Sequence, residues 1–187
     1  MMSKGRFEGF TDAILAIIMT IMVLEIKTPK TPNLAGLREL ALPLLAFFVS
    51  FFSLGNLWYS HHALFKDADI ISYQSVLLNM LLLAWVALVP VVTAWVAEFP
   101  AAKMPERAFA LVTLGWILIL NLLIHSVHRD NPHATIVVRA FAWWSVLALL
   151  AVIVFPLPYS GLGVGTILMV RIPYIFLRRE QRINRSN

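Results

Sequence analysis

The chain has 187 residues, of which 60% are hydrophobic and only 13% charged, and its mean hydropathy is +0.80. Soluble domains are about half apolar and a quarter charged, so this composition excludes a soluble protein and indicates an integral membrane protein. The net charge of +5 favours anionic lipid headgroups over nucleic acid as the partner, because basic residues flank the apolar segments, and the absence of cysteine excludes disulfides and thiolate chemistry.

The first apolar segment, residues 13–24, contains one polar residue, Thr20, and is bounded by Asp12 and Glu25. Its twelve residues would rise only about 18 Å as a helix. The hydrocarbon core of a bilayer is about 30 Å thick, so a helix exposed to lipid could not keep both carboxylates in water. Either the helix is peripheral, or its polar ends lie within the thickness of the membrane, shielded by protein. The second alternative suits an inner helix that lines a hydrated path.

The residues before this segment predict how the helix begins. Thr11 or Asp12 can accept hydrogen bonds from free backbone N–H groups, and Asp12 also complements the positive end of the helix dipole, so the helix is predicted to begin there. Arg6 lies six residues upstream. Because an unpaired aspartate within a membrane is costly, we expect Arg6 and Asp12 to form an ion pair.

One face of the first segment carries an apolar stripe at helical spacing, formed by Ala13, Ile17, Thr20 or Ile21, and Leu24. If this face contacted lipid, it would be an ordinary membrane surface. If copies of it met around a symmetry axis, the isoleucines and Leu24 would form stacked hydrophobic rings beside the hydroxyl of Thr20. The periodicity alone does not decide between these alternatives.

Six apolar segments follow one another along the chain, separated by charged, proline-rich or glycine-rich breaks. They predict an all-α protein with six transmembrane helices in a single domain, residues 1–187. With the N-terminus in the cytoplasm, most of the 15 lysine and arginine residues lie on the cytoplasmic side, which places both termini there. The segments cover about residues 6–24, 38–64, 70–97, 107–126, 135–155 and 162–177.

Polar residues in the first three segments approach the same membrane face on this topology. They are Arg6 and Asp12 in the first segment, Trp58 and His61 in the second, and Asn79 in the third. Lipid cannot solvate such groups. We therefore expect a hydrogen-bonded cluster that holds the first helix against the second and third.

Other signals carry no assignment. His61 and His62, or His125 and His128, have spacings seen among metal ligands, but no carboxylate or third histidine stands at a fitting offset, so no metal and no other cofactor is predicted. Residues 161–165, GLGVG, read as a turn because no pore helix precedes them. The sequence shows no nucleophile–base pair or phosphate loop, and we predict that the protein is not an enzyme.

The first segment resembles the first-helix signature of the transmembrane-protein-175 potassium channels. The family pattern has an arginine, three residues and Phe-Ser-Asp, then an apolar stretch with a threonine and a terminal Val-Leu-Glu. The chain has Arg6, Phe10-Thr11-Asp12, Thr20 and Val23-Leu24-Glu25 in these places. The strings around Trp58, His61 and Asn79 resemble the second and third helices of the family, and the length is similar to that of its prokaryotic single-repeat subunits.

This resemblance implies a homotetramer in which the first helices line a central pore, without a selectivity-filter loop. It places the hydrophobic constriction at Ile17, with further narrow layers at Ile21 and Leu24, and the selectivity-linked threonine at Thr20. It also implies that the protein lies in the cell membrane of a prokaryote. Finally, it implies a structural polar cluster. The cluster consists of Arg6, Phe10, Thr11 (where the family has serine) and Asp12, braced by Trp58, His61 and Asn79.

We therefore predict a potassium-permeable, leak-type cation channel. The first alternative is a proton-coupled secondary transporter in which Asp12 titrates, although the inverted repeat and broken helices of such proteins are not visible in the sequence. The second alternative is an accessory membrane subunit that conducts nothing.

Overall fold

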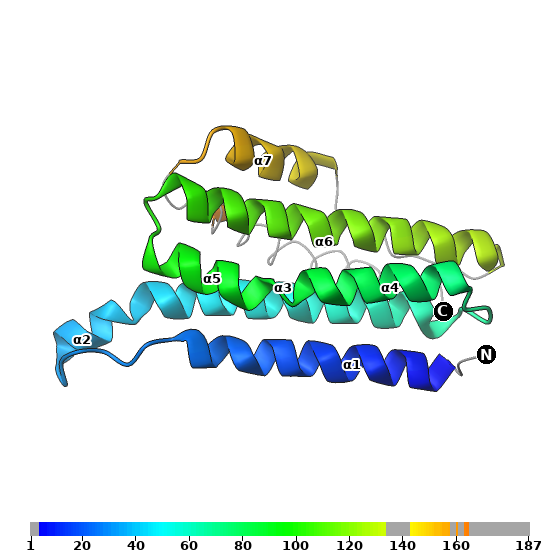
Figure 1. Cartoon of the computed structure of the whole chain (residues 1–187), viewed down its shortest axis with the longest axis horizontal. Helices are drawn as coiled ribbons and strands as arrows, with labels where there is room; N and C mark the ends of the chain where they lie inside the picture. Colours follow the sequence, from blue (N-terminus) through cyan, green and yellow to red (C-terminus); the bar gives the residue numbers. More distant parts are fainter. Residues whose placement is uncertain (1–3, 134–142, 158–159, 161–162, 165–187) are drawn as a thin grey trace, which may run out of the picture.

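The computed structural model describes residues 4–133, 143–157, 160 and 163–164, and these residues form helices and no strand. The helices pack lengthwise in a bundle, with α1 and α7 on opposite sides of it (Figure 1). In chain order they are α1 (Lys4–Ile21), the 3-10 helix η1 (Met22–Glu25), α2 (Leu34–Glu39), α3 (Ala41–Lys66), α4 (Tyr73–Val86), α5 (Val89–Glu98), α6 (Lys103–Asp130) and α7 (Trp143–Val154).

The first helix begins earlier than the sequence predicted, at Lys4 instead of near Thr11 or Asp12. No proline interrupts residues 4–10, and Phe7 and Thr11 stand four residues apart on the same buried face. Packing of this face outweighs the local capping preference of Thr11 and Asp12. Residues 4–25 form one continuous span of 22 residues, which rises about 33 Å and is long enough to cross the hydrocarbon core.

Four spans of the described residues are long and apolar enough to cross a membrane: Lys4–Glu25, Leu34–Lys66, Tyr73–Glu98 and Lys103–Asp130. They correspond to the first four predicted segments. Of the fifth segment the structure describes α7, and residues 135–142 lie outside the described residues. The sixth segment, 162–177, also lies outside them, apart from residues 163 and 164.

The third span is divided into two helices near Pro90. Proline has no N–H to donate to the preceding turn, and α4 ends at Val86, four residues before Pro90. Pro90 then occupies the first turn of α5, where a missing N–H costs little. The single predicted segment is thus an interrupted span, packed on α3, α1 and α6.

The long helix α6 lies between α7 and the α4–α5 pair (Figure 1). The contact between α4 and α6 is close at Gly115, where an added Cβ would overlap the indole of Trp85. The Trp85 Nε1–H donates to the carbonyl oxygen of Val112 at 3.0 Å. The absence of a side chain at residue 115 therefore lets the indole lie against the backbone of α6.

Replacing Gly115 with alanine is expected to lower the free energy of unfolding by about 1–3 kcal/mol, because the new methyl group must displace Trp85. Gly55 on α3 is the matched control, since an added Cβ there would meet no atom within 4 Å. Gly55→Ala should leave the free energy of unfolding unchanged or raise it by up to about 1 kcal/mol, because alanine favours the helix. Denaturation of each purified variant in detergent measures both values, and equal stability of the two variants would contradict the packing described.

Asn131 closes the end of the bundle at which α3, α4 and α6 meet. Its Oδ1 accepts the backbone N–H groups of Asp69 and Ile70, both at 2.9 Å. Its Nδ2 donates to the carbonyl oxygens of Ile70 at 2.9 Å and Val127 at 3.0 Å. One side chain thereby fixes the α3–α4 connection on the C-terminus of α6.

Candidate functional site

The first helix has one face packed in the bundle and one face that no other described helix of the chain covers. Phe7, Thr11, Leu15 and Ile18 are buried, and Met22 continues this face into η1. Their spacing of three or four residues keeps them on the same side of the helix. The packed face carries the polar cluster, and the uncovered face carries the apolar stripe.

The buried part of the cluster consists of Thr11, His61 and Asn79, from three different helices. The Asn79 Nδ2 donates to Thr11 Oγ1 at 2.8 Å, and Thr11 Oγ1 donates to the carbonyl oxygen of Phe7 at 3.3 Å. His61 Nε2 lies 3.0 Å from Asn79 Oδ1. Because an amide oxygen can only accept, Nε2 is the protonated nitrogen. Asn79 thus joins α1 to α3 through both ends of its amide.

Two phenylalanines close this cluster on its apolar side. The ring of Phe7 stacks on His61 with the centroids 5.9 Å apart, and it lies 4.8 Å from the ring of Phe65. His61 and Phe65 are themselves 4.7 Å apart. Neither Phe7 nor Phe65 was predicted from the sequence to belong to the cluster. Their four-residue spacings from Thr11 and His61 are the signal that would have identified them.

Asp12 is held by Trp58 and not by Arg6. The Trp58 Nε1–H donates to Asp12 Oδ1 at 2.8 Å, and the indole stacks on the ring of His62 with centroids 6.1 Å apart. Among the described residues, the predicted ion pair between Arg6 and Asp12 does not form. The helix is continuous from Lys4, so six residues place the two side chains about 120° apart around it and about 9 Å apart along it.

The structure therefore brings together five of the predicted cluster residues, namely Thr11, Asp12, Trp58, His61 and Asn79. The other two, Arg6 and Phe10, are exposed on the uncovered side of α1.

Replacing Trp58 with phenylalanine keeps an aromatic ring but removes the N–H that Asp12 accepts. A typical hydrogen bond contributes about 0.5–1.5 kcal/mol net, and this one is exposed in the single chain, so Trp58→Phe should lower the free energy of unfolding by about this amount. Thermal unfolding in detergent measures the change. Asp12→Asn is the matched control, because it keeps an oxygen acceptor at the same place and should lose less. An unaltered Trp58→Phe variant would show that the bond contributes no stability.

The uncovered face of α1 exposes the stripe residues to different degrees. Ile17 is 55% exposed, Ile21 is 42% exposed and Leu24 is 79% exposed. The Thr20 hydroxyl lies 3.0 Å from the carbonyl oxygen of Ala16 and 2.8 Å from that of Ile17, so its proton is directed to its own helix. The lone pairs of the hydroxyl oxygen remain available to a cation or a water molecule.

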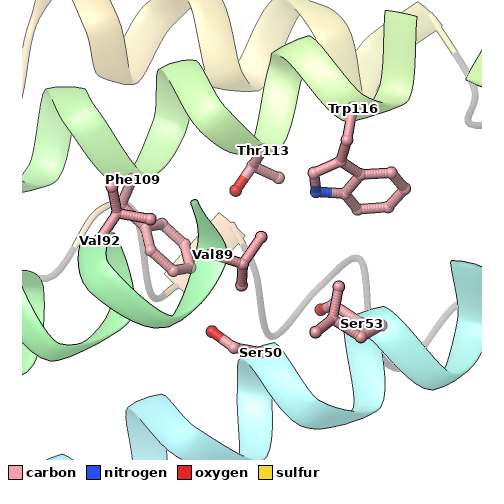
Figure 2. A pocket seen from close by; sticks show the side chains of 8 residues that line it. Ser50, Ser53, Val89, Val92, Phe109, Thr113 and Trp116 are labelled. Carbon is pink, nitrogen blue, oxygen red and sulfur yellow. The ribbon is translucent and has the colours of Figure 1, made fainter. Parts of the chain in front are cut away.

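A cavity in the described interior of the bundle is too small to be a comparable path for an ion. A cavity where α3, α5 and α6 meet has a volume of only about 10 Å³, the lower limit for one water molecule. Ser50 and Ser53 of α3 point into it towards Thr113 and Trp116 of α6 (Figure 2). The Ser50 and Thr93 hydroxyls are hydrogen-bonded at 2.8 Å. This junction is a packed, satisfied contact, so the uncovered face of α1 is the better candidate for a path that ions follow.

Comparison with known proteins points to one family. The family model described as "Endosomal/lysosomal potassium channel TMEM175" matches residues 6–90. A Chryseobacterium sp. (strain P1-3) protein named as a potassium channel is 28% identical, over 99% of this chain and 98% of its own. A Bos taurus protein named as the endosomal/lysosomal proton channel TMEM175 is 31% identical, over 63% of this chain and 27% of its own.

A solved structure agrees with these sequence matches. The crystal structure of a lysosomal potassium-selective channel TMEM175 homolog from Chamaesiphon minutus superimposes with a TM-score of 0.78 at 27% identity. The alignment covers 91% of this chain and 96% of that chain. The match to residues 6–90 includes α1, α3 and α4, and therefore both the polar cluster and the uncovered stripe.

Proposed function

Because residues 6–90 match the TMEM175 family model and the relatives are named as ion channels, we propose that the chain is a TMEM175-type, potassium-permeable, leak-type cation channel and not an enzyme. The observation that carries this proposal is the uncovered apolar face of α1, on which Ile17, Ile21 and Leu24 are all exposed. In a membrane protein such a face contacts lipid or lines a path. The Chryseobacterium relative is named as a potassium channel and the Chamaesiphon minutus homolog as a potassium-selective channel, and both names support the second alternative.

The proposed assembly is a homotetramer of six-helix, single-domain subunits, residues 1–187, with the α1 helices around a central pore. Four copies of the uncovered face would then meet at the axis. This arrangement places Arg6 and Phe10, exposed in the single chain, near neighbouring subunits. It also explains why the packed face of α1 has directional polar contacts, since a helix that lines a pore must be attached to its own subunit on the side away from the pore.

In this pore, ions would cross a ring of Ile17 side chains that forms the narrowest layer, followed by layers at Ile21 and Leu24. Hydrophobic constrictions control conduction by wetting and dewetting. Only the Thr20 hydroxyl oxygens replace lost water near these rings. Potassium is favoured over sodium on this proposal because it gives up its hydration shell at a lower free-energy cost.

We further propose a multi-pass location in a cell membrane with both termini in the cytoplasm. The support is the distribution of basic residues along the chain. In this orientation the polar cluster lies towards the cytoplasm, and Glu25 lies at the outer end of α1 and η1.

The proton is the competing permeant ion, because the bovine relative is named as a proton channel. The proton-coupled transporter gains no support, since the relatives are named as channels. Between Asp12 and Glu25 the proposed pore surface has no ionisable side chain. A relay of protons would therefore need a continuous water chain through the Ile17 ring.

The decisive test is the reversal potential of the purified protein in liposome patches. With symmetric potassium and a pH step of about two units, a potassium channel should reverse near zero. A proton pathway or a proton-coupled carrier would shift the potential towards that of the proton, by up to about 120 mV. A large shift would overturn the potassium assignment. The absence of current from correctly folded protein would instead support an accessory subunit.

A further inference from the structure

A large open pocket lies at the end of the bundle opposite the polar cluster. Its volume is about 430 Å³, within the range of small-molecule sites. Its walls come from three places: the end of η1 with the segment that follows it, the start of α3 with the residues before it, and α5. These parts meet at the end of the bundle where α2 lies (Figure 1). The polar cluster does not contribute to it.

The outer rim of the pocket is charged with both signs. Lys27 and Glu98 form an ion pair of 2.8 Å between the segment after η1 and the end of α5. Glu39 accepts the backbone N–H of Lys30 at 3.4 Å. Glu25 and Lys30 are the other charged residues that line the pocket. A ligand can therefore meet acceptor-only carboxylates and a lysine donor at the same end of the pocket.

The inner wall of the pocket is apolar. It is formed by Met22, Pro43, Phe47, Pro90 and Ala94, which lie on spans that cross the membrane. From Glu98 to Pro90, α5 descends about 12 Å along its axis. The pocket thus runs from the depth of the headgroups to the depth of the upper acyl chains. A soluble, polar ligand would have no apolar part to contact this wall.

We propose that this pocket binds a phospholipid whose headgroup carries a primary ammonium group, such as phosphatidylethanolamine. The ammonium group has three N–H donors for Glu25 and Glu39, and the phosphate accepts from Lys30. The upper part of one acyl chain lies along Phe47, Pro90 and Ala94. A choline headgroup has no N–H donor for the carboxylates, and a glycerol headgroup has no cation. This binding does not depend on whether the chain conducts ions.

The site is tested by photo-crosslinking of the full chain, purified in detergent, with a phosphatidylethanolamine that carries a diazirine on its acyl chain. Mass spectrometry of peptides maps the label. We expect label on residues 22–47 and 90–98, and we expect unlabelled phosphatidylethanolamine to reduce it at least several-fold more than phosphatidylcholine or phosphatidylglycerol. Equal competition by all three lipids would overturn the headgroup assignment.

Two variants of α5 separate the pocket from the general lipid surface. Ala94→Trp fills the apolar wall and should remove most of the label, whereas Val91→Trp places the same side chain on the exposed face of α5 outside the pocket. Val91→Trp should therefore keep the label. Lys30→Gln should weaken competition by phosphatidylethanolamine several-fold. Retention of the full label in Ala94→Trp, or its absence from the wild type, would overturn the proposal.

Discussion

Replacing Ile17 with asparagine should raise potassium flux through the reconstituted protein about tenfold, which corresponds to a barrier lower by about 1.4 kcal/mol. Ile17 lies in the middle of the uncovered stripe of α1 and is 55% exposed in the single chain. A polar amide at this place would hydrate the proposed constriction, so that an ion need not cross a dry ring. Flux from potassium-loaded liposomes measures the effect.

Two controls assign this effect to the position and not to a general loss of structure. Ile17→Leu keeps the side chain apolar and of similar volume, so flux should stay near the wild-type value. Leu118→Asn introduces the same amide on an exposed face of α6, where no pore is proposed. Normal flux in Ile17→Asn, or an equal increase in Leu118→Asn, would contradict the constriction at Ile17.

Replacing Asn79 with alanine should lower the free energy of unfolding by about 2–4 kcal/mol. The amide is fully buried and satisfies both His61 Nε2 and Thr11 Oγ1. Each buried polar group left without a partner costs about 1–3 kcal/mol, and the bilayer offers no water to replace it. Thermal unfolding in detergent measures the loss, and it should be accompanied by reduced flux because α1 loses its hydrogen bond to α4.

Asn121→Ala provides the matched control for this variant. Asn121 is partly buried on α6, and its Nδ2 donates to the carbonyl oxygen of Ile117 in the same helix at 2.8 Å. Its removal breaks no described hydrogen bond between helices, and alanine is the better helix former. Stability should therefore change little. An Asn79→Ala protein as stable as Asn121→Ala would show that the buried amide is not what holds α1.

Much of the polar cluster could be predicted from the sequence, because a polar residue within an apolar span needs a partner. Arg6, Asp12, Trp58, His61 and Asn79 were identified on this basis, and all except Arg6 form hydrogen bonds between helices. The choice of partners could not be predicted. The pairing of Asp12 with Trp58 depends on how α1 and α3 are rotated against each other, which the packing of Phe7 against His61 and Phe65 decides.

The limits of the spans were predicted less well, for physical reasons that the structure makes plain. The start of α1 was placed too late, because the capping preference at Thr11 and Asp12 is local whereas the packing of Phe7 is tertiary. The third segment was predicted as one helix, and the structure divides it into α4 and α5 near Pro90. In the described part of the chain, the uncovered side of α1 is the feature that supports the proposed oligomer.

The uneven attachment of α1 has a mechanical consequence. In the described part of the chain, its side-chain hydrogen bonds to other elements come from Lys4, Thr11 and Asp12. From there to Leu24 the helix is held by apolar packing, which has no preferred direction and permits small sliding movements. The helix can therefore tilt about a point near Asp12.

The twelve residues from Asp12 to Leu24 rise about 18 Å, so a tilt of about 5° around Asp12 would displace Leu24 by about 1.5 Å. The same tilt would move Ile17, which is only about 8 Å from Asp12, by less than half as much. Tilting would therefore act mainly on the proposed layers at Ile21 and Leu24. The diameter of the proposed ring at Ile17 would change by less than half as much as that of the layer at Leu24, so its state would depend more on hydration.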